Sequence, residues 1–210
     1  HEGLTGLGKH LHGGIGSLQR RVKFSAVPFV RRAEGRCDVT MDETSDQLSN
    51  KLLLADANIL IDLFLADALG LIGELSRYGI AQIFIPRMIY DEVSTQISEG
   101  CIAELGITVL PVTAELSQRV LDYPDRRLSM PDRSLLLMAE AESFGVWTND
   151  RRLRENCRKH GIEVWWEFQL LKELVGVGGL DRDALLAVAK RIEELNPFME
   201  GLEEKLQGEM

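Results

Sequence analysis

Four acidic residues of this 210-residue chain stand next to apolar segments, where their carboxylates could act together. They are Asp56, which ends LLLAD; Glu92, in PRMIYDEV; Asp132, which follows the dipeptide MP; and Asp150, in VWTND. Carboxylates gathered in a partly buried site repel one another, which raises their pKa values and lowers stability. Hard divalent cations remove that repulsion and prefer oxygen ligands. We therefore expect the four residues to form one catalytic site that binds Mg²⁺ or Mn²⁺.

Phosphodiester hydrolysis is the chemistry that such a site suits. A bound divalent ion can turn a water into a nucleophile and neutralise charge on a phosphodiester. Each aspartate also has a local explanation, because Asp near a helix start commonly caps the helix or interacts with its dipole. The joint pattern of four acids, rather than any one of them, favours the metal site.

The elements that must position these acids alternate along the chain. We expect strands at residues 52–56, 80–85, 107–112, 146–148 and 162–166, and helices at 59–71, 86–97, 115–121, 132–144, closed by Gly145, and 151–160. This βαβ alternation predicts an α/β fold, a three-layer α/β/α sandwich with a mostly parallel central sheet of four or five strands. Ligands of such sheets bind outside the carboxyl ends of the strands, and the four acids map to that edge.

The chain divides into three parts. Residues 51–166 form the predicted catalytic domain, and residues 167–210 a C-terminal helical extension with apolar faces. The extension could cover an edge of the sheet, form a dimer interface or receive a partner peptide. Residues 1–50 are rich in Gly, Ser and Arg, so we interpret them as a flexible leader, either upstream or added sequence.

Composition limits the class of protein. No apolar run is long enough for a membrane helix and no secretory signal opens the chain, so we expect a soluble, cytoplasmic protein that does not contact membranes. Three widely spaced cysteines indicate neither a disulfide framework nor a zinc site.

Charge limits how the protein could bind nucleic acid. Residues 1–40 hold seven Lys/Arg against three Asp/Glu, a charge of +4. Since the whole chain carries -9, the remaining residues carry -13. An acidic body argues against nucleic-acid binding by bulk electrostatics, so contacts must be local. The densest basic stretch directly follows Asp150, and we expect Arg151 and Arg152 to contact the phosphate backbone of a nucleic-acid substrate. The alternative is an ordinary solvated helix face.

Neighbouring polar residues compete for the same roles. Side chains one residue apart on a helix diverge by about 100°, so Asp91 and Glu92 cannot both face the site, and the YDEV context favours Glu92. Asp62 could support the site from behind or lie in solvent. Either Asn149 or Asp150 could cap the helix that follows, and we assign Asp150 to the metal ion.

Four segments give the pattern a family resemblance. LLLADANIL, PRMIYDEV, MPDRSLLLMAEAE and VWTNDRRLR, in this order, resemble the PIN-domain ribonucleases, notably the toxins of type II toxin–antitoxin pairs. The resemblance covers about residues 51–166. It implies that Asp56, Glu92, Asp132 and Asp150 are catalytic and coordinate Mg²⁺ or Mn²⁺, and that Asn58 supports Asp56. The chain departs from the family at Ala57, where Thr or Ser is commoner.

The resemblance implies a function and several partners. We expect a metal-dependent endoribonuclease that hydrolyses RNA phosphodiester bonds, is toxin-like, is held inactive by an antitoxin protein and forms a homodimer. One alternative is a non-catalytic PIN-like module that binds RNA or another protein. A phospho-accepting receiver domain is a third option, but it would want a Lys after the last strand, where this chain has Glu167.

Overall fold

The computed structural model describes residues 50–209, so the predicted leader, except for Asn50, lies outside the described residues. The elements are β1 (Lys51–Ala55), α1 (Ala57–Leu65), α2 (Gly70–Arg77), β2 (Ala81–Pro86), α3 (Arg87–Val93), α4 (Glu99–Glu104), β3 (Thr108–Leu110), α5 (Ala114–Asp122), α6 (Met130–Glu142), β4 (Gly145–Trp147), α7 (Arg151–Lys159), β5 (Val164–Trp165), α8 (Glu167–Gly176), α9 (Arg182–Leu195), the 3₁₀ helix η1 (Pro197–Met199) and α10 (Leu202–Glu209).

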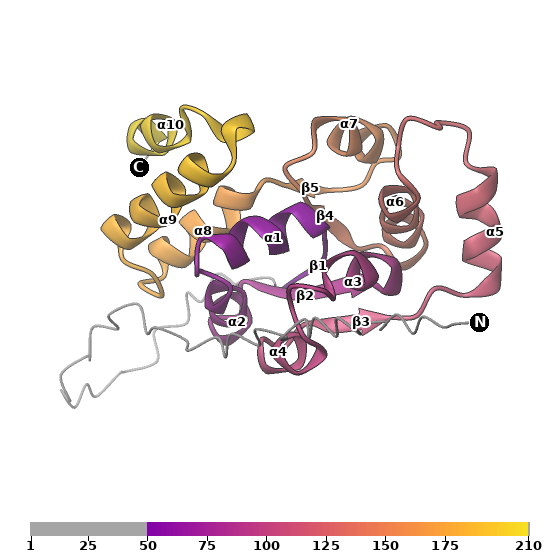
Figure 1. Cartoon of the computed structure of the whole chain (residues 1–210), viewed down its shortest axis with the longest axis horizontal. Helices are drawn as coiled ribbons and strands as arrows, with labels where there is room; N and C mark the ends of the chain where they lie inside the picture. Colours follow the sequence, from indigo (N-terminus) through magenta and orange to yellow (C-terminus); the bar gives the residue numbers. More distant parts are fainter. Residues whose placement is uncertain (1–49, 210) are drawn as a thin grey trace, which may run out of the picture.

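The five strands form one sheet in the order β3-β2-β1-β4-β5, and every pair is parallel. The prediction of an α/β fold with a mostly parallel sheet is therefore confirmed. Right-handed crossovers put α2 and α4 on one face of the sheet and α6 and α7 on the other. Figure 1 shows α2 and α8 on one side of the strands and α6 on the other, which gives three layers.

The central strand explains why the sheet is enclosed on both faces. Leu53, Leu54 and Ala55 of β1 are successive residues, so their side chains point to alternate faces, and all three are fully buried. Continuous apolar runs of this kind are typical of parallel strands that are covered on both sides. The apolar segment LLLA thus determines the centre of the sheet.

The strand order reverses beside β1. The chain runs from β1 outward to β3, then returns to place β4 on the other side of β1. In open α/β sheets the crevice at this switch point, outside the carboxyl ends of the strands, is where ligands bind. The order also differs from the 2-1-3-4-5 order of receiver domains, so the fold does not support that alternative.

Two predicted helices have different limits. The helix expected at 59–71 is two helices, because Asp67 adopts a left-handed conformation (φ 56°) and the Ala68 N–H closes the end of α1 on the Leu63 carbonyl. The helix expected at 86–97 ends at Val93, and α4, which was not predicted, begins after Ser98. The Ser98 side chain caps α4 by accepting from the Cys101 N–H.

The end of α6 also differs from the prediction. Ser143, with φ 56°, terminates the helix, and Gly145 is already part of β4. A Cβ at position 145 would lie 2.6 Å from Leu53 Cδ2, so any larger residue there would have to displace the buried Leu53 side chain.

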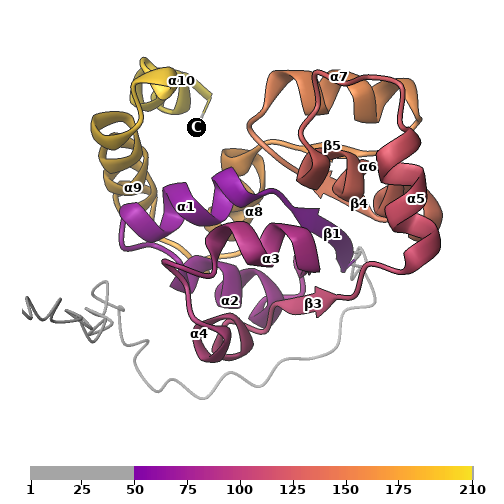
Figure 2. The same cartoon turned by 45° about the vertical axis from the view of Figure 1, so that its right-hand side comes forward.

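The helices after Trp166 pack on the body of the protein. α8 contacts α2, and α9 contacts α1, as Figure 2 shows on the side away from α6 and α7. The apolar face of α9 is buried by these contacts at Leu185, Ala189 and Ile192. In the part of the chain that the structure describes, every helix is too short or too polar to cross a bilayer.

Candidate functional site

Asp56 and Thr148 lie side by side where β1 and β4 end. The parallel register pairs Ala55 with Trp147, and the Asp56 N–H donates to the Trp147 carbonyl at 3.0 Å. Asp56 and Thr148, the residues that follow this pair, are therefore neighbours, and the Thr148 hydroxyl donates to Asp56 Oδ2 at 2.7 Å. Thr148 Oγ1 also accepts from the Asp150 N–H at 3.0 Å. One hydroxyl therefore fixes the geometry of the switch point.

Thr148 is not among the site residues that the sequence predicts. The signal that identifies it is the parallel register, since the residue after one strand lies beside the residue after its neighbour. A prediction of which strands are neighbours would have been needed to use that signal.

The Asp56 carboxylate is buried and carries uncompensated charge. Only 2% of the residue is exposed, and burial is the main reason that its pKa rises to about 6. The negative charges of Asp132 and Asp150 raise the pKa further, whereas the Thr148 hydroxyl and the Asn58 N–H lower it. Within residues 50–209 no cationic side chain bonds to Asp56. A divalent cation is the kind of ligand that would relieve this arrangement.

Asp132 and Asp150 each serve as a helix-capping residue. Asp132 Oδ2 accepts from the Ser129 N–H at 3.0 Å, and Ser129 Oγ accepts in return from the Asp132 N–H, which forms a capping box at the start of α6. Asp150 Oδ1 accepts from the Leu153 N–H at 2.6 Å and caps α7. The local explanation is thus correct for both residues, and Asp150 rather than Asn149 is the cap. Asp132 Oδ1 and Asp150 Oδ2 make no hydrogen bond with any described residue.

Glu92 lies near Asp132, on an exposed part of α3. Partial burial and the negative charge of Asp132 raise the pKa of its carboxyl. The adjacent Asp91 instead forms an ion pair with Arg87 at 2.9 Å on the exposed face of the helix. The structure therefore brings Glu92, and not Asp91, towards the other acids.

The four acids share one edge without forming a closed cage. Among the described residues no three Asp, Glu, His or Cys side chains are grouped so that they could hold a metal ion. Mg²⁺ usually keeps several waters and uses only one or two carboxylates of the protein, so a closed cage of side chains is not required for it.

The two asparagines that were expected to support the acids, Asn58 and Asn149, lie in different places. Asn58 is exposed, and its Nδ2 lies 3.5 Å from Asp56 Oδ2, at the limit of a hydrogen bond. Asn149 binds Glu167 instead of the four predicted acids: its Nδ2 donates to Glu167 Oε2 at 2.6 Å, and its Oδ1 accepts from the Glu167 N–H. Asn149 thus links the end of β4 to the start of α8.

Glu167 and Asp62 form a second, buried acidic pair. Glu167 is fully buried, and burial, with a smaller effect of the Asp62 charge, raises its pKa to about 8. Asp62 is 7% exposed and accepts from Asn196 Nδ2 at 3.1 Å. The interpretation of Asp62 as a solvated residue is therefore wrong, because the segment that joins α9 to η1 covers this face of α1.

A cavity of about 450 Å³ opens beside the acidic edge. It is lined by Arg127, Leu128, Asp132, Asp150, Arg151, Arg152 and Glu155. Of the two predicted substrate contacts, Arg151 is paired with Glu155 at 2.9 Å, and Arg152 donates to the Arg127 carbonyl at 3.0 Å. A larger cavity of about 520 Å³ beside α5 includes none of the four acids, so its size does not indicate a role in this chemistry.

Comparison with known proteins adds no identification. No protein-family model matches the chain, and no curated protein matches it at a significant level. The site is therefore defined by its residues alone: a buried aspartate at the switch point of a parallel sheet, with two helix-capping aspartates and a glutamate near it.

Proposed function

We propose that this protein is a PIN-like, metal-dependent endoribonuclease that hydrolyses RNA phosphodiester bonds. The observation that carries the proposal is Asp56, an ionisable side chain that is buried at the switch point without a cationic partner among the described residues. Burial of unpaired charge lowers stability, so such a residue points to function rather than to packing.

The available donor atoms fit Mg²⁺ or Mn²⁺. Asp56, Asp132, Asp150 and Glu92 offer carboxylate oxygens, which hard divalent cations prefer. Burial, and then the charge of Asp132, raise the pKa of the nearby Cys157 thiol to about 12, so it is protonated in the metal-free protein. Asp56, Asp132 and Asp150 would hold the ion directly or through its waters.

The side chains around the site would hold the carboxylates in position and supply the negative charge that attracts the ion. When bound, the ion would neutralise charge on the phosphodiester and make a water more acidic. Thr148 orients Asp56, and the capping bonds hold Asp132 and Asp150 so that one oxygen of each stays available. Glu92, which is more exposed, completes the site and helps to position the attacking water.

The family resemblance also suggests the biological setting. We propose a toxin-like protein that an antitoxin holds inactive and that forms a homodimer. The second candidate is a non-catalytic PIN-like module that binds RNA or another protein. It is favoured by one observation, that the acids are not grouped tightly enough to hold an ion as they stand among the described residues.

RNA cleavage distinguishes the two candidates. Structured and single-stranded RNAs are incubated with wild-type protein and with Asp132→Asn, in Mg²⁺, in Mn²⁺ or in EDTA. We expect cleavage only by wild type with a metal ion, and a DNA of the same sequence tests the substrate class. Equal cleavage by both proteins would refute the mechanism. Metal-independent RNA binding that Asp132→Asn and Asp56→Asn leave unchanged, without cleavage, would support the non-catalytic module.

A further inference from the structure

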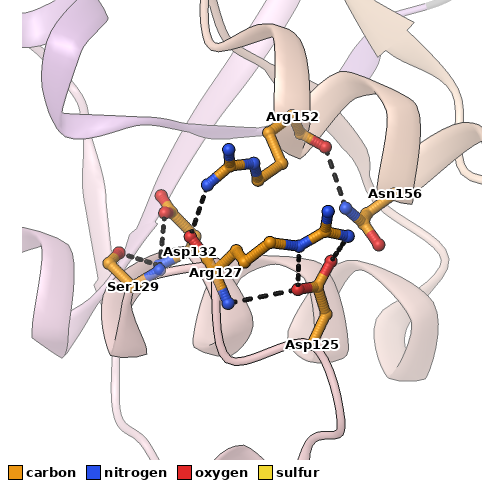
Figure 3. A network of polar contacts seen from close by, with 6 residues as sticks. All are labelled: Asp125, Arg127, Ser129, Asp132, Arg152 and Asn156. Atoms are coloured by element: carbon orange, nitrogen blue, oxygen red, sulfur yellow. Dashed lines mark hydrogen bonds and ion pairs between the residues drawn. The ribbon is translucent and has the colours of Figure 1, made fainter.

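The segment between α5 and α6, residues 123–129, meets the start of α7 beside the acidic edge. Arg152 Nη1 donates to the Arg127 carbonyl at 3.0 Å, as Figure 3 shows. Leu128 is buried, and its N–H donates to the Asp125 carbonyl, so the segment has a defined conformation. Ser129, at its end, is the cap that holds Asp132. The segment thus contains Arg127, contacts Arg152 and ends at the cap of Asp132, one of the acids of the proposed site.

The Arg127 guanidinium is held in a fixed orientation. Its Nε and Nη2 donate to the two oxygens of Asp125 at 2.9 and 3.0 Å, and the Arg127 N–H donates to the same carboxylate. These bonds hold the pKa of Asp125 well below its usual range. Nη1 makes no hydrogen bond with the described residues, and the Arg127 side chain is 71% exposed. One edge of the guanidinium is therefore oriented and open to a ligand.

Arg152 differs from the other arginines that line the cavity. Arg151 is paired with Glu155, and Arg127 with Asp125, whereas Arg152 forms no ion pair within residues 50–209. Its one hydrogen bond uses a single donor of the five that a guanidinium offers. A guanidinium with free donors, in the same cavity as a second one with a free edge, is suited to the oxygens of a phosphate.

From this geometry, and on the basis of the proposed function, we infer that Arg127 and Arg152 together bind a backbone phosphate of the RNA strand next to the bond held at the acids. Both arginines line the same cavity as Asp132 and Asp150, so this phosphate would lie close to the one that reacts. Arg151, by contrast, should contribute less, since its guanidinium is held by one bond to Glu155 on a side chain that is 87% exposed, whereas two side-chain bonds fix the orientation of Arg127.

The lining of the cavity also predicts the kind of contact. Its side chains are arginines, carboxylates and one leucine, without an aromatic ring on which a base could stack. The lining therefore offers no aromatic platform for base stacking, and contacts to phosphate carry no sequence information. The Arg127–Arg152 pair should therefore bind RNAs of different sequence equally well.

The test measures RNA binding separately from cleavage. Fluorescence anisotropy follows two labelled single-stranded RNAs of unrelated sequence, in EDTA so that no metal-dependent cleavage occurs, over a range of salt concentrations. The variants are Arg127→Gln and Arg152→Gln, with Arg127→Lys and Arg152→Lys as charge-conserving versions. Arg126→Gln is the matched control, because it removes the same charge from the same segment but Arg126 does not line the cavity.

We expect Arg127→Gln and Arg152→Gln each to weaken binding of both RNAs by about tenfold relative to Arg126→Gln. The slope of log K against log salt should fall by up to about 0.7, the value for one phosphate of a single strand. The lysine variants should keep the slope and lose part of the affinity, because lysine keeps the charge but not the fork. Thermal unfolding checks the fold, and if Arg127→Gln does not fold, Arg127→Lys and Arg152→Gln decide the result.

The outcomes separate this inference from the proposed function. If binding by Arg127→Gln and Arg152→Gln equals that of Arg126→Gln, the phosphate contact is refuted, even when wild type cleaves RNA with a metal ion. If both variants lose binding while wild type never cleaves, the phosphate contact stands and the nuclease is refuted. A loss confined to one of the two RNA sequences would also overturn the inference.

Discussion

Substitution of Asp56 by Asn should make the metal-free protein more stable at neutral pH. The carboxyl group is almost fully buried, and its pKa rises from 3.8 to about 6. Each tenfold change in proton affinity corresponds to about 1.4 kcal/mol, so the ionised carboxylate lowers the free energy of unfolding by about 3 kcal/mol. The amide introduced by Asp56→Asn would keep an oxygen acceptor for the Thr148 hydroxyl without the charge.

The sign of this effect depends on pH. Below the unfolded pKa of 3.8 the carboxyl is protonated in both states, so wild type loses no stability through it. As the pH rises from 3.8 to about 6, the unfolded chain ionises first and wild type becomes less stable; above about 6 the loss is complete. The advantage of Asp56→Asn should therefore be large at about pH 7.5 and nearly absent at about pH 3.5.

Urea denaturation in EDTA at these two pH values measures the effect. Asp67→Asn is the control, because Asp67 is exposed and its left-handed conformation accepts Asn. We expect Asp56→Asn to exceed both wild type and the control by about 2–3 kcal/mol at the higher pH. A variant that is equal to wild type or less stable there, or a gain that does not change with pH, would refute the electrostatic reasoning.

Three further substitutions test the surroundings of the site. Thr148→Val removes the donor to Asp56 and the acceptor for the Asp150 N–H, so the free energy of unfolding should fall by about 1–3 kcal/mol in the same urea titrations. Thr148→Ser keeps both bonds and should lose only about 1 kcal/mol, for the buried methyl group that it removes. Burial raises the pKa of the Glu167 carboxyl to about 8, so its ionisation disfavours the folded state. Glu167→Gln should therefore lose less stability than wild type as the pH rises from about 5 to about 9, and an equal loss in both proteins would contradict this explanation. Gly145→Ala places a Cβ 2.6 Å from Leu53 Cδ2 and should cost about 1–3 kcal/mol, measured as a lower urea midpoint. An unchanged midpoint would contradict this, since it would mean that the Leu53 side chain moves aside without cost.

The sheet and its acidic edge could be predicted because they depend on local pattern. LLLAD, IAQIFI and ITVLPV are short apolar runs, and the strands lie within or next to them, as Lys51–Ala55, Ala81–Pro86 and Thr108–Leu110. Alternation with helices makes the strands parallel, and parallel strands place their carboxyl ends together. Asp56, which directly follows β1, and Asp150, which lies between β4 and α7, are therefore located at this edge by the pattern alone.

The hydrogen bonds within the site could not be predicted in this way. Asn149 and Asp150 are equally good caps from sequence, and the choice between them depends on Glu167, 18 residues further along, which binds Asn149. The burial of Asp62 depends on Asn196, 134 residues away. Such contacts are set by the packing of distant helices, which periodicity does not determine. The break after α1 depends on one residue, Asp67, whose type does not require a left-handed conformation.

Calorimetric titration of Mn²⁺ into the protein at about pH 7.5 tests the central claim most directly, because Asp56 is then ionised. We predict saturable binding to wild type and to Asp67→Asn, loss of binding in Asp56→Asn, and weaker binding to wild type as the pH falls below about 6. Binding that is absent from wild type, or that Asp56→Asn leaves unchanged, would contradict a metal site at the carboxyl ends of β1 and β4.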